Sequence, residues 1–104
     1  MLHTNLTGTI HCLELARRSG ADVIFLSTSR VYPIVPLRAL PLQREGDRLN
    51  QPEGAGGDGW SRAGISAGFP LAGYRSMYGA TKLASELLIE EYRAMYGLRT
   101  VVNR

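Results

Sequence analysis

Residues 21–29 have the sequence ADVIFLSTS, in which four apolar residues, Val23 to Leu26, follow Asp22. The four favour β-structure and do not alternate with polar residues, which is typical of a strand covered on both faces in a parallel sheet. Three hydroxyl residues, 27–29, come directly after them. Because ligands of open α/β sheets bind at the carboxyl ends of the strands, this stretch predicts a buried parallel strand that ends at a ligand-binding edge.

Helical patterns flank this strand on both sides. Apolar residues recur at three- and four-residue spacing in residues 2–18, and Ser19-Gly20 follows as a stop signal. The same spacing returns in residues 78–92, with Gly97 as the expected cap, and residues 98–103 have the pattern of a second buried strand. The order helix, strand, long loop, helix, strand predicts an α/β fold, part of a Rossmann-like doubly wound parallel sheet.

The connection between the strand and the second helix, residues 33–74, contains all five prolines and most of the glycines. Its periodicity is weak, so we expect a long, structureless active-site loop. Two strands leave unpaired backbone edges on both sides of a sheet. We therefore expect residues 1–104 to be the central, catalytic part of a larger α/β domain, truncated at both ends.

Composition and charge disfavour several classes of function. The formal net charge is +3, but the arginines are scattered among acidic residues and form no stripe, so nucleic-acid binding is not expected. No stretch approaches the ~18 apolar residues that span a membrane, and the start lacks the pattern of a secretion signal. The single cysteine, Cys12, cannot form an internal disulfide. We expect a soluble, cytoplasmic protein.

Residues 54–59, GAGGDG, match the dinucleotide-binding pattern G-x-G-x-x-G, but the context does not fit. The stretch follows Asn50-Gln51-Pro52-Glu53 instead of an apolar strand, opens no amphipathic helix, and lacks an acidic residue at the ribose-binding distance. We interpret it as the tip of a flexible loop, because glycine-rich stretches are common in linkers.

Tyr78 and Lys82 place a phenol and an amine at positions i and i+4, on one face of a helix and about 5 to 6 Å apart at Cβ. An ammonium group this close stabilises a phenolate, the form that removes a proton from a sugar hydroxyl. The alternative is a surface lysine after a half-buried tyrosine. Lys82 is the only lysine of the chain, and an arginine does not offer the same compact, tunable ammonium.

Thr28 is a third candidate, because its hydroxyl at the strand end is placed to bond the substrate oxygen that Tyr78 deprotonates. The alternative interpretation is a turn residue that ends the strand. Neither motif is specific when taken alone. Their joint occurrence, in this order, is more specific than either motif.

Together these segments resemble extended short-chain dehydrogenases/reductases of the NAD-dependent epimerase/dehydratase family. Residues 26–32, LSTSRVY, are similar to their strand-end motif, residues 78–82 to their Y-x-x-x-K, and residues 5–9, NLTGT, leading into LELA at 13–16, to their preceding helix. The stretch RSMYGATKLASEL at residues 75–87 and the YGLR ending at 96–99 most resemble enzymes of the CDP-paratose 2-epimerase type. The resemblance covers the whole chain except the middle of the loop.

The resemblance implies roles for individual residues. Tyr78 would be the catalytic base, Lys82 would orient the nicotinamide ribose of NAD, and Thr28 would position the substrate. Thr4 would approach the cofactor, and Asn5 would help hold the active-site backbone. The implied substrate is a nucleotide sugar, with a CDP-linked sugar as a candidate. No metal is implied, and relatives often form homodimers through the helix that carries Tyr78 and its partner helix.

Two departures from the pattern bear on the reaction. The 4,6-dehydratases of this family carry Asp-Glu after the strand-end threonine, whereas this chain has Ser29-Arg30, which favours epimerisation over elimination of water. Ala67 stands where many relatives have an acid. The sequence thus predicts part of an NAD-dependent nucleotide-sugar epimerase that oxidises and re-reduces a sugar carbon; the alternatives are a dehydratase or reductase of the same family, or a truncated chain without activity of its own.

Overall fold

The computed structural model describes residues 1–104, which form two compact units. Unit 1 consists of Met1–Val31 and Ser76–Arg104, and unit 2 consists of Tyr32–Arg75. All the sequence-predicted site residues lie in unit 1. None of the helices in either unit is both long enough and apolar enough to cross a membrane.

Unit 1 contains the two predicted helices. A π-helical turn, η1 (His3–Thr7), continues directly into α1 (Gly8–Ser19), which ends at Gly20 with a φ of 72°. The second long helix, α3 (Met77–Tyr96), begins where the Ser76 hydroxyl accepts a hydrogen bond from the Gly79 N–H. It ends at Gly97, whose φ of 65° is the left-handed conformation that glycine adopts without strain. Both helices and the Gly97 cap confirm the spacing-based prediction.

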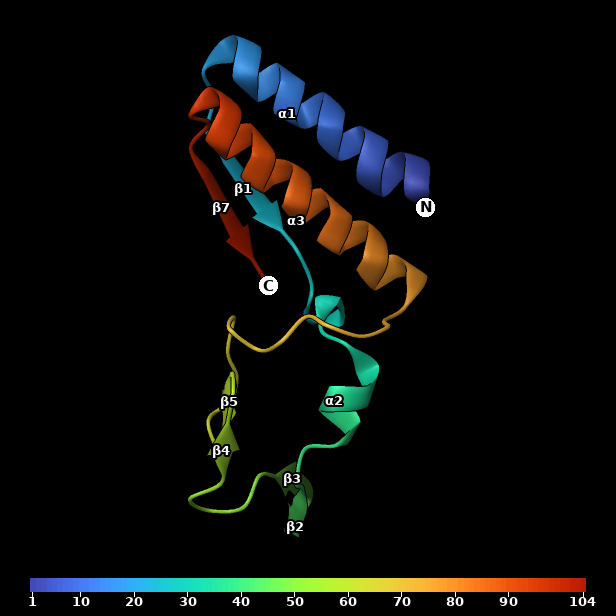
Figure 1. Ribbon diagram of the computed structural model, residues 1–104, viewed down its shortest axis with the longest axis vertical. Coiled ribbons are helices and arrows are strands. Elements are labelled where there is room, and N and C mark those ends of the chain that lie inside the picture. Colours follow the sequence, from blue (N-terminus) through green and yellow to red (C-terminus); the bar gives the residue numbers. More distant parts are fainter. The chain divides into compact units, whose positions relative to one another are not determined.

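The two strands of unit 1 are β1 (Val23–Leu26) and β7 (Thr100–Asn103), with a short 3-10 turn, η2 (Ser29–Val31), after β1. They pair in parallel, with Val23 opposite Thr100 and Leu26 opposite Asn103. The helices α1 and α3 lie side by side over one face of this sheet (Figure 1). This mixed arrangement with a parallel sheet confirms the predicted fold class, a partial Rossmann-like α/β fold.

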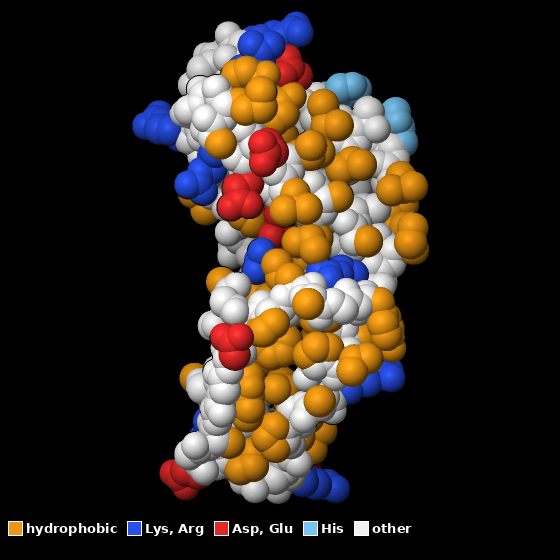
Figure 2. Space-filling view, viewed as in Figure 1, with side chains coloured by type: hydrophobic (Ala, Val, Ile, Leu, Met, Phe, Trp, Pro, Cys, Tyr) orange, Lys and Arg blue, Asp and Glu red, His pale blue; other side chains and the backbone are white.

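The core of unit 1 lies between the helices and the sheet. Leu13 and Ala16 from α1 meet Ile89 from α3 and Leu98, with Val23, Phe25, Leu88 and Tyr92 packed around them. On the face shown in Figure 2, hydrophobic side chains also lie among charged ones over the helices. Exposed apolar side chains of the two helices include Leu15 of α1 and Met95 of α3, each 67% exposed.

The other face of the sheet is open, which corrects the prediction of two buried strands. Ile24 is 73% exposed, Leu26 67% and Val101 57%. Side chains alternate between the two faces of a strand, and the two helices cover only one of them. The apolar pattern was typical of a strand covered twice, but residues 1–104 supply a single covering layer.

Unit 2 corrects the prediction of a structureless connection. It contains a five-residue helix, α2 (Ile34–Arg38), an antiparallel hairpin of β2 (Gln43–Glu45) and β3 (Arg48–Asn50), and a small antiparallel sheet of β4 (Gly56–Gly57), β5 (Trp60–Ser61) and β6 (Gly64–Ile65). Strands of two or three residues are too short to produce a hydrophobic period, so weak periodicity did not mean absent structure.

Specific contacts hold unit 2 together. The Arg62 guanidinium donates to both carboxylate oxygens of Glu45, at 2.9 Å each, and this is the main cause that lowers the Glu45 pKa to about 2. The rings of Tyr32 and Phe69 meet edge to face with centroids 5.7 Å apart. The side chains therefore fix this long connection in a defined conformation.

The glycine-rich stretch 54–59 opens no helix, in agreement with the sequence context. It is more ordered than the predicted loop tip, however, because Gly56 and Gly57 pair with Ser61 and Trp60 of β5. A Cβ at Gly59 would lie 2.3 Å from the Phe69 Cα, so glycine is required there for close backbone packing. The stretch is followed by a strand, and it does not form the turn that receives a pyrophosphate at a helix N-terminus.

Candidate functional site

The carboxyl end of β1 is fixed by three contacts. The Ser27 N–H donates to the Asn103 carbonyl of β7 at 2.7 Å, which extends the parallel pairing by one residue. The Ser27 hydroxyl donates to the Glu86 carboxylate of α3. The Leu26 carbonyl accepts from the Lys82 ammonium at 2.7 Å. The strand end is thus tied both to its neighbouring strand and to α3.

Thr28 begins the turn that follows β1. Its hydroxyl oxygen accepts the Arg30 N–H at 3.2 Å, and its carbonyl accepts the Val31 N–H at 3.3 Å. Thr28 therefore makes the contacts expected of a turn residue that ends the strand, which was the alternative interpretation of this position. These contacts occupy one acceptor site of the hydroxyl and leave its O–H free to donate, so they are compatible with a substrate contact as well.

The turn after Thr28 packs closely against the start of α3. A Cβ on Gly79 would lie 2.1 Å from the Arg30 carbonyl oxygen, so only glycine allows this approach. Gly79 directly follows Tyr78 in the helix. The close packing therefore brings residues 28–31 to the part of α3 that carries the tyrosine.

Three side chains at four-residue intervals run along α3: Tyr78, Lys82 and Glu86. Tyr78 is 40% exposed. The Lys82 ammonium lies 4.2 Å from the centroid of the Phe25 ring in addition to its bond with Leu26. No hydrogen bond joins the Tyr78 hydroxyl to Lys82 or Thr28. The helix therefore places Tyr78 and Lys82 one turn apart, and the Lys82 ammonium is hydrogen-bonded to the strand.

A second network supports this part of α3 from the π-helical turn. The Asn5 amide donates to the Thr81 hydroxyl at 3.0 Å, and that hydroxyl donates to the Tyr78 carbonyl at 2.7 Å. In return, the Ser85 hydroxyl donates to the Asn5 carbonyl at 3.1 Å. Thr81 and Ser85 are buried. Asn5 thus holds the backbone of the helix between Tyr78 and Lys82.

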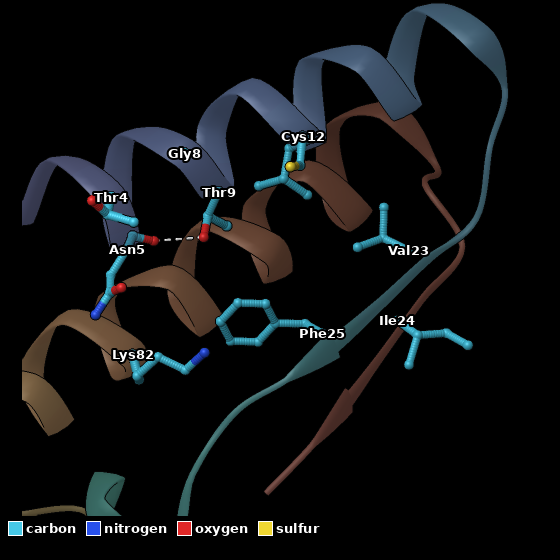
Figure 3. Close-up of a pocket in the computed structure, with 10 residues that line it drawn as sticks. Thr4, Asn5, Gly8, Thr9, Cys12, Val23, Ile24, Phe25 and Lys82 are labelled. Atoms are coloured by element: carbon cyan, nitrogen blue, oxygen red, sulfur yellow. Dashed lines mark hydrogen bonds between the residues drawn. The ribbon is translucent and has the colours of Figure 1, made fainter. Parts of the chain in front are cut away.

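A groove of about 400 Å³ lies between the start of α1, β1 and α3 (Figure 3). Lys82 enters it from α3 and points toward the Phe25 ring, and Thr4 and Asn5 line its other side. The remaining lining residues are Gly8, Thr9, Cys12, Leu13, Val23 and Ile24. Polar groups therefore lie at one end of a groove whose strand side is apolar, a combination that is typical of small-molecule sites.

The structure brings the sequence-predicted residues into one region. Thr28, Tyr78 and Lys82 lie where the end of β1 meets the start of α3, and Thr4 shares a groove with Lys82. Their catalytic roles remain predictions. No group of three or more His, Cys, Asp or Glu side chains is placed to hold a metal ion.

Sequence reasoning missed three residues at this site: Ser27, Glu86 and Arg104. Glu86 is only 7% exposed and forms an ion pair with Arg104 at 2.6 Å. Its position one turn beyond Lys82 was visible in the sequence as an i, i+4, i+8 series from Tyr78. The partner Arg104 is 18 residues away from Glu86, and no local spacing indicates that pairing.

Comparison with known proteins supports the resemblance at the level of the family. No curated protein and no solved structure matches the chain. The family model described as NAD dependent epimerase/dehydratase family matches residues 1–104. Because this match extends over every element of unit 1 and unit 2, the chain belongs to the NAD-dependent epimerase/dehydratase family.

Proposed function

We propose that this chain is the central, catalytic part of an NAD-dependent nucleotide-sugar epimerase of the CDP-paratose 2-epimerase type. The main support is that Thr28, Tyr78 and Lys82 converge where β1 ends and α3 begins. That edge of a parallel sheet is where ligands of α/β proteins bind. The family match supplies the general chemistry, and the substrate class rests on the resemblance of residues 75–87 and 96–99.

In this proposal Tyr78 is the base. Its side chain is partly exposed, so its hydroxyl is accessible to a sugar hydroxyl. Thr28 has a free O–H, and it donates to the same substrate oxygen that Tyr78 deprotonates. The turn contacts of the Thr28 oxygen with the Arg30 N–H hold this hydroxyl in place before substrate binds.

Lys82 has a positioning and a binding role. An ammonium group has three N–H donors, and the Leu26 carbonyl uses one of them. The other two are available to a ribose hydroxyl in the groove that Lys82 shares with Thr4. Anchoring on β1 fixes the ammonium group beside the first turns of α3, one turn from Tyr78.

A nicotinamide cofactor is implied by the family, and the residues of the groove fit one half of it. Lys82 and Thr4, with Tyr78, would hold the nicotinamide and its ribose. The bound cofactor supplies the hydride chemistry, taking a hydride from a sugar carbon and returning it. The glycine stretch 54–59 does not form a pyrophosphate cradle, because it leads into β5 and not into a helix.

The open sheet in unit 1 supports the proposal that the chain belongs to a larger domain. Each of β1 and β7 has one unpaired edge, and Ile24, Leu26 and Val101 are exposed on the face away from the helices. Further strands and helices of the domain would pair with these edges and cover this face. We call the chain extended by those elements the complete protein.

Epimerisation is favoured over elimination of water because Ser29 and Arg30 follow Thr28, where dehydratases have an acid pair. Arg30 contributes its N–H to the turn and its carbonyl packs against Gly79, and neither Ser29 nor Arg30 has an acidic side chain. The dehydratase and the reductase remain alternative functions within the family. Homodimer formation through α1 and α3, also a property of relatives, is part of the proposal and is tested by light scattering of the complete protein.

The first test is calorimetric titration of NAD into the 104-residue chain and into the complete protein. We expect binding by the complete protein alone, because residues 54–59 supply no cradle. Binding by the short chain with similar affinity would contradict this account of the cofactor site. A variant with Gly56 replaced by Ala serves as the control, since the stretch 54–59 has no part in the proposed site and a Cβ at Gly56 would come no closer than 3.5 Å to another residue.

The second test identifies the reaction. CDP-paratose is incubated with the complete protein and NAD, and the products are followed by proton NMR. Epimerisation yields an isomer of unchanged mass, and the changed couplings between neighbouring ring protons show which carbon is inverted. Parallel incubations test the alternatives: a dehydratase would release water from a nucleotide sugar that has a 6-hydroxyl, and a reductase would consume added NADH with a keto sugar. Turnover in either of these, in place of CDP-paratose, would replace the proposed epimerase by its alternative.

A further inference from the structure

Glu86 is a buried carboxylate that the proposed reaction does not use. Its side chain is 7% exposed, and its oxygens accept hydrogen bonds from the Ser27 hydroxyl and from Arg104. The Arg104 Nε lies 3.0 Å and the Nη2 2.6 Å from Oε2 of Glu86. A buried charge is retained only when it is paired, and Arg104 provides that pairing. While its Oε2 is paired with Arg104, the carboxylate accepts the Ser27 hydroxyl on Oε1 in a charge-assisted hydrogen bond.

The Ser27 contact matters because of what lies next to it. Ser27 is the residue before Thr28, and its N–H is bonded to the Asn103 carbonyl of β7. Two residues beyond Thr28, the Arg30 carbonyl rests against Gly79 of α3. The segment that carries Thr28 is thus attached to α3 on both sides, by Glu86 before it and by Gly79 after it.

Glu86 and Lys82 act on consecutive residues of the strand end. Lys82 binds the Leu26 carbonyl, and Glu86, one helical turn later, binds the Ser27 hydroxyl. Both contacts connect β1 to the helix that carries Tyr78. The separation of Thr28 from Tyr78 is therefore set by the same helix at two successive turns.

We propose that Glu86 is a positioning residue, which acts through Ser27 to hold Thr28 in the geometry that Tyr78 requires. This inference rests on the proposed function, because it assigns Glu86 a purpose in the same reaction. Glu86 itself does not touch the substrate. Arg104 pairs with the carboxylate and orients it, and it also attaches the end of β7 to α3.

A purely structural role makes a different prediction. If Glu86 served only to pair with Arg104, removal of the Ser27 hydroxyl would leave the site unaffected, because the ion pair would persist. Ser27→Ala removes that hydroxyl and no other group of the network, so it separates the two explanations. Glu90→Gln, a change in an exposed carboxylate one turn further along α3, is the matched control.

The first experiment uses the 104-residue chain and does not depend on any enzymatic activity. Amide hydrogen exchange of residues 27–31 is followed by NMR in the wild type, Ser27→Ala, Glu86→Gln and Glu90→Gln. We expect the Arg30 and Val31 amides to exchange about tenfold faster in Ser27→Ala and unchanged in Glu90→Gln. Equal exchange in Ser27→Ala and the wild type would overturn the inference.

The second experiment measures kcat and the dissociation constant of NAD in the complete protein, with CDP-paratose as substrate. We expect kcat to fall about tenfold in Ser27→Ala and about a hundredfold in Glu86→Ala, with partial recovery in Glu86→Gln, while NAD binding changes by less than about twofold. The double variant Ser27→Ala/Glu86→Ala is expected to be no slower than Glu86→Ala, because both changes break one linkage.

The two experiments separate failure of this inference from failure of the proposed function. A wild-type protein that turns over CDP-paratose and loses no kcat in Ser27→Ala would leave the function intact and overturn the role of Glu86. A wild-type protein without turnover would reject the function, and the exchange rates would still decide whether Glu86 positions residues 27–31. If Glu86→Ala does not fold, Ser27→Ala alone carries the test.

Discussion

At the residue scale, the proposed reaction depends on the Tyr78 hydroxyl. Tyr78→Phe removes only this hydroxyl from a side chain that is 40% exposed, so the helix and the groove are expected to persist. We expect turnover of the complete protein to fall by several orders of magnitude with little change in NAD affinity, because the base is lost and the cofactor contacts of Lys82 and Thr4 remain. Steady-state kinetics and calorimetry check this, and unchanged turnover would reject Tyr78 as the base.

Gly79 offers a second prediction at the same scale. Alanine is the better helix former, by about 1 kcal/mol, but its Cβ would lie 2.1 Å from the Arg30 carbonyl. We expect Gly79→Ala to push residues 28–31 away from α3 and to destabilise the 104-residue chain by about 1 to 3 kcal/mol in urea unfolding.

Gly8 is the matched control for this substitution. It lies in α1 with helical dihedral angles, and a Cβ there meets no atom within 4 Å. We expect Gly8→Ala to stabilise the chain by about 0.5 to 1 kcal/mol. Equal effects at the two glycines would show that the close approach of the turn to α3 is absent in solution.

Individual site residues differed in how far the sequence could predict them. Tyr78 and Lys82 were found because they share a helix and their spacing is local, and Thr28 because it directly follows an apolar strand. The roles of Ser27 and Glu86 were not found, since their contact joins positions 59 residues apart. Only the folded arrangement of β1 on α3 shows why a buried carboxylate is needed there.

At the element scale, α1 and α3 are joined by a network around Glu14. Its carboxylate accepts from Arg17 at 2.8 Å in the same helix and from the Tyr92 hydroxyl of α3, also at 2.8 Å. The Arg17 hydrogen bond, followed by that of Tyr92, lowers the Glu14 pKa from 4.5 to about 2. The bond to Glu14 also raises the pKa of Tyr92. The network thus favours a charged Glu14 and a neutral Tyr92.

The sign of the pH dependence follows from these directions. Because the folded pKa of Glu14 is lowered, its contribution to stability is present above pH 4.5 and is lost as the pH falls toward about 2. The raised pKa of Tyr92 has the opposite sense: its contribution is complete below pH 10 and is lost as the pH rises through its folded value. We expect Glu14→Gln to reduce the loss of stability between pH 4.5 and 2, as measured by urea unfolding. Glu45, whose pKa is also lowered to about 2, still contributes to the loss of stability in acid in that variant.

A Glu14→Gln variant with the wild-type acid response would show that the two helices are not joined through this carboxylate. The control is Glu91→Gln, an exposed position on α3. Its acid response is expected to equal that of the wild type.

Elements with a clear period were predicted well, and short ones were not. The helices α1 and α3 have 12 and 20 residues, enough for a period of 3.6 to become visible, and a glycine marks the C-terminal end of each. In residues 33–74 the strands have two or three residues each, and their order comes from turns and from contacts such as Arg62 with Glu45. Those contacts join residues 17 apart, which a local pattern does not indicate.

At the scale of the whole molecule, the open face of the sheet links the structure to the proposal of a larger domain. Ile24 and Val101 are paired in register on this face and are 73% and 57% exposed. In the 104-residue chain we expect the double variant Ile24→Thr/Val101→Thr to change stability by less than about 0.5 kcal/mol, because neither side chain is in the core. Binding of the dye anilinonaphthalene sulfonate, which reports exposed apolar surface, is expected to fall.

In the complete protein the same double variant is expected to behave differently. If further elements of the domain cover this face, both side chains are buried, and the change to threonine places two hydroxyls in an apolar layer. We expect a loss of about 2 to 4 kcal/mol in urea unfolding, since each buried hydroxyl without a partner costs about 1 to 3 kcal/mol. The helix-facing variant Phe25→Ala should destabilise both forms, because Phe25 packs against the core of unit 1 in either case. Equal tolerance of the double variant in the short and complete forms would mean that this face stays exposed, and the apolar run that predicted a strand covered twice would then need another explanation.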